Sequence, residues 1–250
     1  MIDRIISSTN HIVLRRRKYR LSKLEEEILK EYIHFPESEV LVVAIPGWGS
    51  SFLRWNGLEK FVKEKKYSLL TYEFPREIVS VNLHLTGESF HKSAQIIRKD
   101  ISNFKEKYNF KRIVILAYSL GVTLAALVYK ENHSITDIVL VCPGNDIAED
   151  MWFGCHTQFL RKVYEKKGGT LARLKNAVKN LAFEKNLPAR EARTLIYYGK
   201  YDEVVKNAQG RELLRVLREH NLRFKSKEIR MGHYLTCAYF LKFPERFIQL

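Results

Sequence analysis

Short apolar runs alternate along this chain with longer segments in which apolar residues recur every three or four positions. The runs lie at residues 40–45, 67–74, 113–116, 137–142 and 194–198, and a last strand is expected at 224–229. Runs of this length are typical of strands buried on both faces. The segments 88–108, 120–131 and about 208–220 have the spacing of helices. The alternation predicts an α/β protein with a doubly wound, mostly parallel sheet.

The two ends of the chain depart from this alternation. Residues 21–32 have helical spacing, with a capping box that begins at Ser22 and with Pro36 shortly beyond the end. A short closing helix is expected over 239–250. Residues 1–20 are basic and poorly patterned, and the sequence leaves open whether they form an arm, an edge strand or an electrostatic patch.

An insertion without a convincing strand separates the runs at 137–142 and 194–198. It extends from about 145 to 192 and contains an aromatic cluster that includes Trp152 and Phe153. A long insertion after the carboxyl end of a strand is usually a lid over a site. We therefore expect one domain over residues 1–250 with a helical lid at 145–192. Residues 161–193 carry ten Lys or Arg against three Glu, a net charge of +7, which fits either a solvated face or an anionic ligand.

Ser119 lies where a predicted strand turns into a predicted helix. Ala117 and Gly121 stand two residues before and two residues after it. Small residues at these positions let the strand and helix backbones approach each other, which leaves the serine hydroxyl on an exposed tip. A serine hydroxyl is too weak an acid to attack an acyl group alone, so it needs a base, an acid and donors for the developing oxyanion.

Residues that could serve as base and acid follow other predicted strands. His233 comes after 224–229 and is the expected base, and Asp202 comes after 194–198 and is the expected carboxylate that orients the imidazole. Asp146 and Glu149, after 137–142, are the alternative acid. Four histidines lack such a context and are interpreted as surface or structural residues: His91, His133, His156 and His220.

The remaining parts of the expected site are backbone donors and pocket residues. The N–H of Leu120, at the start of a helix, and the N–H of Trp48, in a glycine-bearing loop after 40–45, are the expected oxyanion donors. Gly49 is the other candidate donor in that loop. The residues expected to contact substrate are Gly49, Tyr118, Trp152 and Phe153.

These motifs together resemble the α/β-hydrolase superfamily over roughly residues 40–250. The matching segments are AYSLG at 117–121, GKYD at 199–202, GH at 232–233 and PGWG at 46–49, and their order is the superfamily's order of serine, acid and histidine. There are two departures, because Ala117 replaces the commoner glycine and Pro46 stands where many relatives carry histidine. The chain before Val40 is short for the superfamily's first hairpin, of which residues 10–20 would supply a remnant.

Composition narrows the class of protein but names no partner. The chain has 250 residues, 46% of them hydrophobic, and a net charge of +15. Its three cysteines have no CxxC spacing, so neither a disulfide framework nor a zinc site is indicated. No apolar run approaches the roughly 20 residues that cross a bilayer, and no signal peptide is recognisable, so a cytoplasmic protein is expected. We expect no metal and no cofactor.

The sequence favours a serine hydrolase of the carboxylesterase or lipase type, which cleaves a carboxylic ester or related acyl bond through an acyl-enzyme in a lid-gated pocket. The alternatives are a thioesterase or acyltransferase with the same triad, and a non-catalytic binding protein that uses its basic surface. The expected partner is a small acyl compound, with an anionic lipid or membrane surface as a further candidate. No motif that reads nucleic acid is present. The natural substrate, the acyl chain length and the oligomeric state stay open.

Overall fold

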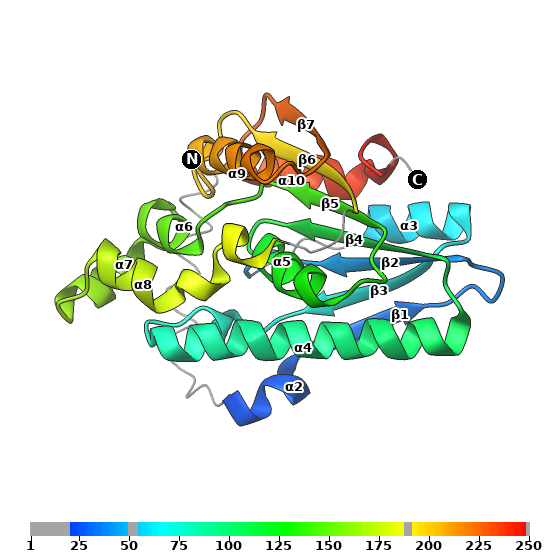
Figure 1. Ribbon diagram of the computed structural model, residues 1–250, viewed down its shortest axis with the longest axis horizontal. Helices are drawn as coiled ribbons and strands as arrows, with labels where there is room; N and C mark the ends of the chain where they lie inside the picture. The colour runs from blue at the N-terminus through cyan, green and yellow to red at the C-terminus, as the bar shows by residue number, and fades with distance from the viewer. Residues whose placement is uncertain (1–20, 50–54, 188–191, 249–250) are drawn as a thin grey trace.

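Seven strands form one sheet in the part of the chain that the computed structural model describes, residues 21–49, 55–187 and 192–248 (Figure 1). The strands are β1 (Leu29–Ile33), β2 (Val40–Ile45), β3 (Ser68–Glu73), β4 (Arg112–Tyr118), β5 (Asp137–Val141), β6 (Arg193–Gly199) and β7 (Phe224–Ile229). Their order across the sheet is β1-β3-β2-β4-β5-β6-β7, and only β1 runs antiparallel to its neighbour. The predicted doubly wound, mostly parallel sheet is confirmed.

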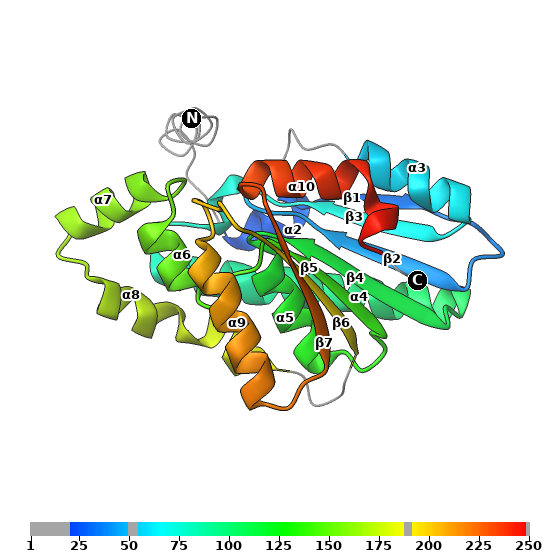
Figure 2. The ribbon, with the colours of Figure 1, turned by 90° about the horizontal axis from the view of Figure 1, so that it is seen from above.

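Helices cover both faces of this sheet. On one face lie α4 (Leu83–Tyr108), α5 (Gly121–Glu131) and α9 (Asn207–Glu219), and on the other lie α3 (Asn56–Lys65) and α10 (His233–Lys242) (Figure 2). Side chains alternate between the two layers along each strand. In β2, for example, Leu41 and Val43 join the core of the first face, whereas Val42 and Ala44 join the core of the second.

The prediction of a helix over residues 21–32 is wrong for its second half, where the chain forms a strand. A single turn η1 (Leu21–Lys23) leads into α2 (Leu24–Glu27), after which the chain becomes the edge strand β1. Backbone pairing between Leu29–Ile33 and β3 overrides the local helical spacing, and the apolar Leu29 that completed the pattern is 60% exposed. The basic segment 1–20, with its expected hairpin remnant at 10–20, lies outside the described residues.

The insertion after β5 is built from α6 (Ile147–Phe153), α7 (Gln158–Lys166), α8 (Leu171–Val178), η3 (Lys179–Leu181) and η4 (Phe183–Asn186). Helices α6, α7 and α8 lie beyond the carboxyl ends of the central strands (Figure 1), whereas η4 packs against α5 and α9. Buried apolar residues connect them to the main core, among them Leu160 and Leu174. Residues 188–191 of the predicted lid lie outside the described part of the chain.

The last helix starts earlier than the sequence suggested. The closing helix was expected at 239–250, but α10 begins at His233 and is followed by η5 (Pro244–Arg246). His233 is therefore the first residue of a helix. A further turn, η2 (Arg76–Ile78), follows β3. None of the described helices is both long enough and apolar enough to cross a membrane.

Candidate active site

Ser119 occupies a sharp turn between β4 and α5. Its φ angle of 54° lies in the left-handed region, which non-glycine residues adopt rarely. Its N–H donates to the carbonyl of Val141 in β5 at 2.9 Å. The strained backbone is thus held by the neighbouring strand at the residue that carries the candidate nucleophile. Two residues later, a Cβ on Gly121 would lie 2.4 Å from the carbonyl oxygen of Ile45, so the helix starts in close contact with β2.

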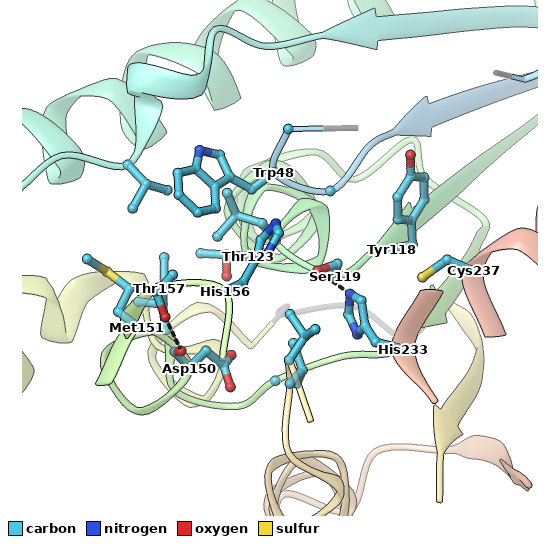
Figure 3. A pocket seen from close by; sticks show the side chains of 18 of the residues that line it. Trp48, Tyr118, Ser119, Thr123, Asp150, Met151, His156, Thr157, His233 and Cys237 are labelled. Atoms are coloured by element: carbon cyan, nitrogen blue, oxygen red, sulfur yellow. Dashed lines mark hydrogen bonds between the residues drawn. The ribbon is translucent and has the colours of Figure 1, made fainter. Parts of the chain in front are cut away.

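The structure brings Ser119, His233 and Asp202 together from three segments of the chain (Figure 3). His233 Nε2 is 2.9 Å from Ser119 Oγ, and His233 Nδ1 is 2.7 Å from Asp202 Oδ2. The other oxygen of Asp202 accepts from the N–H groups of Val204 and Val205 at 2.9 Å and 2.8 Å. The tautomer that satisfies both ring contacts donates from Nδ1 to Asp202 and accepts the Ser119 hydroxyl at Nε2. This is the geometry of a Ser-His-Asp triad.

The alternative acids lie elsewhere and have other partners. Asp146 caps the N-terminus of α6 by accepting from Ala148 N–H at 2.8 Å. Glu149 is bonded to Lys175 and to Gln209. Asp202 is accordingly the carboxylate that holds the imidazole of the candidate triad.

The two residues expected to donate to an oxyanion lie beside the same space. Trp48 and Leu120 both line the pocket around Ser119, and their N–H groups make no hydrogen bond within the described part of the chain. The Trp48 side chain anchors its loop by donating from Nε1 to the carbonyl of Arg76 at 2.6 Å. A Cβ on Gly47 would lie 2.9 Å from Ser119 Cβ, so this loop runs against the serine. The arrangement offers two donors for a developing oxyanion.

A cavity of about 60 Å³ opens beside Ser119. Gly49 and Tyr118 line it, as expected from the sequence. The insertion at 145–192 contributes five further residues: Ile147, Asp150, Met151, His156 and Thr157. Figure 3 shows Asp150, Met151 and Thr157 across the pocket from Tyr118. Helix α6 therefore forms part of one wall of the cavity.

Trp152 and Phe153 are not among the residues that line this cavity, although both were expected to contact substrate. Trp152 packs edge-on against Tyr164, with Arg161 over its ring. Phe153 is 42% exposed. The helical turn of α6 directs Met151 toward the cavity and the next two aromatic residues away from it, because residues adjacent in a helix point in different directions.

His156 is the pocket residue that sequence reasoning missed. It was interpreted as surface or structural, but it lies in the turn between α6 and α7 and lines the cavity. Its ring contacts the Tyr234 hydroxyl at 3.0 Å and meets the edge of Trp48 with ring centres 5.6 Å apart. Burial, followed by the charge of His233, lowers the pKa of His156 to about 4, so its imidazole is neutral near pH 7. No local motif around position 156 signals this placement.

One group of potential metal ligands occurs within the described residues, and it adjoins the triad. Ligand atoms of Cys142, Cys237 and His233 all lie within 4.8 Å of one another. Both ring nitrogens of His233 are already engaged, by Asp202 and by Ser119. The Cys142 thiol also donates to the carbonyl of His233 at 3.8 Å. The group therefore offers a metal at most two thiols, fewer than the three or four protein ligands that zinc sites use.

The electrostatics of His233 predict an activity that rises with pH. Burial alone would lower the pKa of the imidazole, but the Asp202 carboxylate outweighs it and raises the pKa well above 6.5. Protonated His233 cannot accept the serine proton, so kcat/KM for an uncharged ester should increase as pH rises through this raised pKa. A pH profile of kcat/KM is the measurement. An acidic limb centred at or below pH 6.5 would contradict this account of the histidine.

Several solved structures are similar to this one. The structure is similar to MGS-MChE2, an alpha/beta hydrolase enzyme from the metagenome of sediments of the lagoon of Mar Chica, Morocco, at 20% identity over 89% of this chain and 92% of that one, with a TM-score of 0.54. It is similar to the Pyrococcus furiosus esterase Pf2001 at 15% identity, with 92% of each chain covered and a TM-score of 0.60. The Pyrococcus horikoshii acylaminoacyl peptidase matches at 13% identity over 95% of this chain, with a TM-score of 0.62.

The match with the acylaminoacyl peptidase covers 44% of the peptidase chain, so this chain spans less than half the length of that protein. No protein-family model matches the sequence, and no curated protein matches it closely enough to count as a relative. The parallel sheet, its two layers of helices and the structural likenesses nevertheless agree. This chain has the α/β-hydrolase fold, as the sequence motifs predicted.

Proposed function

We propose that this protein is a serine hydrolase that cleaves a carboxylic ester or related acyl bond through an acyl-enzyme formed on Ser119. The observation that carries the proposal is the hydrogen-bonded chain from Ser119 Oγ through His233 to Asp202. In this mechanism Ser119 attacks the acyl carbon while His233 takes its proton, and the N–H groups of Trp48 and Leu120 stabilise the oxyanion. His233 then returns the proton to the leaving alcohol, and water releases the acyl group by the same steps.

The residues around the cavity support a largely apolar acyl substrate. The cavity is lined by several apolar side chains, among them Val79, Ile147, Met151 and Val204. Water exclusion by the lid segment would strengthen the electrostatic interactions of the triad. We propose that 145–192 acts as the lid, and the support for this role is that α6 and the turn after it form part of the cavity wall.

The test is covalent labelling with a fluorophosphonate, which reacts only with an activated serine. The wild-type protein should be labelled at Ser119, as peptide mass spectrometry would show, and should hydrolyse p-nitrophenyl acetate or butyrate. The Ser119→Ala variant should lose both the label and the hydrolysis. A folded wild-type protein that takes no label would rule out the proposed nucleophile. Hydrolysis of acyl thioesters at higher kcat/KM than the matched oxygen esters would instead support the thioesterase alternative.

A further inference from the structure

Asp150 places a carboxyl group in the wall of the cavity that holds Ser119. It lies in α6 and lines the cavity together with the apolar neighbours Ile147 and Met151. Figure 3 shows it on the lid side of the pocket, close to Thr157. A carboxyl group in such a wall is unusual enough to need a physical reason, because polar groups in ligand pockets are few and serve to orient the ligand.

The backbone around Asp150 fixes its position. Its carbonyl oxygen accepts from the Thr157 hydroxyl at 3.1 Å and from the Gly154 N–H at 3.0 Å. On the other side of the carboxyl group, a Cβ at Gly144 would lie 1.9 Å from Oδ2 and 2.8 Å from Cγ. The carboxyl group therefore occupies space next to residue 144 that a side chain there would make it leave.

Asp150 differs from Asp146, the N-cap of α6, and from Glu149 within α6, because its Oδ1 oxygen has no partner within the described residues. Asp146 caps the helix and Glu149 is bonded to Lys175, whereas Oδ1 of Asp150 is excluded from solvent and makes no hydrogen bond within the described residues. The residue as a whole keeps some exposure, although this atom has none. A buried oxygen without a partner is costly. The other carboxyl oxygen, Oδ2, also makes no hydrogen bond within the described residues, but it is not excluded from solvent, so it is the atom that a ligand in the cavity can reach.

The surroundings of Asp150 favour its neutral form. Burial, followed by the negative charges of Asp202 and Asp146, raises the pKa of Asp150 well above its usual value. A neutral carboxylic acid both donates and accepts a hydrogen bond. A hydroxyl or a carboxamide has the matching donor and acceptor.

We propose that Asp150 is a specificity residue that hydrogen bonds to a neutral polar substituent, a hydroxyl or a carboxamide, carried by the substrate near its scissile carbonyl. This inference rests on the proposed hydrolase function and adds the chemical class of the substrate. Such a site would prefer the polar substrate over its apolar isostere, because the apolar isostere leaves the buried carboxyl group without a partner.

The experiment compares two esters of nearly equal size. p-Nitrophenyl β-hydroxybutyrate carries a hydroxyl where p-nitrophenyl isovalerate carries a methyl group. We expect the wild-type protein to favour the hydroxy ester about tenfold in kcat/KM. The ratio should fall to about one in Asp150→Leu, while Asp150→Asn, which stays neutral and polar, should keep a preference of about threefold. Glu149→Gln is the control, since Glu149 lies in the same helix outside the cavity and its variant should keep the wild-type ratio.

The outcomes distinguish failure of the hydrolase proposal from failure of the role of Asp150. Absence of hydrolysis of both esters, together with absence of fluorophosphonate labelling, overturns the serine hydrolase and with it this inference. Hydrolysis of both esters without a preference overturns the role of Asp150 and leaves the hydrolase intact. A stronger preference for the β-aminobutyrate ester would also overturn it, because an ammonium group calls for an ionised carboxylate. If circular dichroism shows that Asp150→Leu does not fold, the wild-type ratio and the Asp150→Asn ratio still decide the question.

Discussion

Replacing Asp202 with asparagine should reduce kcat for ester hydrolysis by about 10⁴-fold. Oδ1 of Asp202 accepts from the N–H groups of Val204 and Val205, and the asparagine oxygen can keep this role. The asparagine NH₂ would then face Nδ1 of His233, where the carboxylate oxygen now lies at 2.7 Å. An NH₂ donor there favours the tautomer with its proton on Nε2, which cannot accept the Ser119 hydroxyl. Steady-state kinetics on a p-nitrophenyl ester would measure the loss.

Asp146→Asn provides the matched control for this prediction. Asp146 is the alternative acid considered from the sequence, and in the structure it caps α6. Asparagine is as good an N-cap as aspartate, so the variant should keep both its stability and a kcat within about twofold of the wild type. If Asp146→Asn lost activity and Asp202→Asn retained it, the assignment of the carboxylate would be reversed.

The sheet and the candidate triad could be predicted from the sequence because both depend on local patterns. A strand buried on both faces needs a short apolar run wherever it lies in the fold, and β2, β4 and β5 each show one. The turn at Ser119 needs small neighbours, which are also visible locally. Asp202 and His233 follow strands of the same parallel sheet, so the carboxyl ends of those strands bring them toward one edge.

Other features depend on contacts between distant segments and leave no local signal. The strand β1 exists because β3 offers an edge, and its own sequence resembles a helix. Whether Met151 or its neighbours Trp152 and Phe153 face the cavity depends on the rotation of the seven-residue helix α6 about its axis. His156 lies in the turn after this helix, and no pattern within the insertion fixes either placement. Charge likewise names no partner, so the contact with an anionic lipid and the cytoplasmic location stay predictions.

Two glycines in helices give opposite predictions when replaced by alanine, and together they test the packing that holds Ser119. A Cβ on Gly121 would lie 2.4 Å from the Ile45 carbonyl oxygen and 2.6 Å from the Pro46 carbonyl oxygen. Because these atoms belong to the backbone, they cannot move aside as a side chain would, and Gly121→Ala should lower the free energy of unfolding by about 2–4 kcal/mol. Since Ile45 and Pro46 lead into the Trp48 loop, kcat should fall as well.

Gly87→Ala is the matched substitution in α4, where an added Cβ meets nothing within 4 Å. Alanine restricts the unfolded chain and favours the helix, so this variant should gain about 0.5–1 kcal/mol. Urea unfolding followed by circular dichroism would measure both changes with one method. Equal effects of the two variants would mean that α5 can shift away from β2 without cost. A loss at Gly121 alone would show that the close approach of strand and helix fixes the turn on which Ser119 stands.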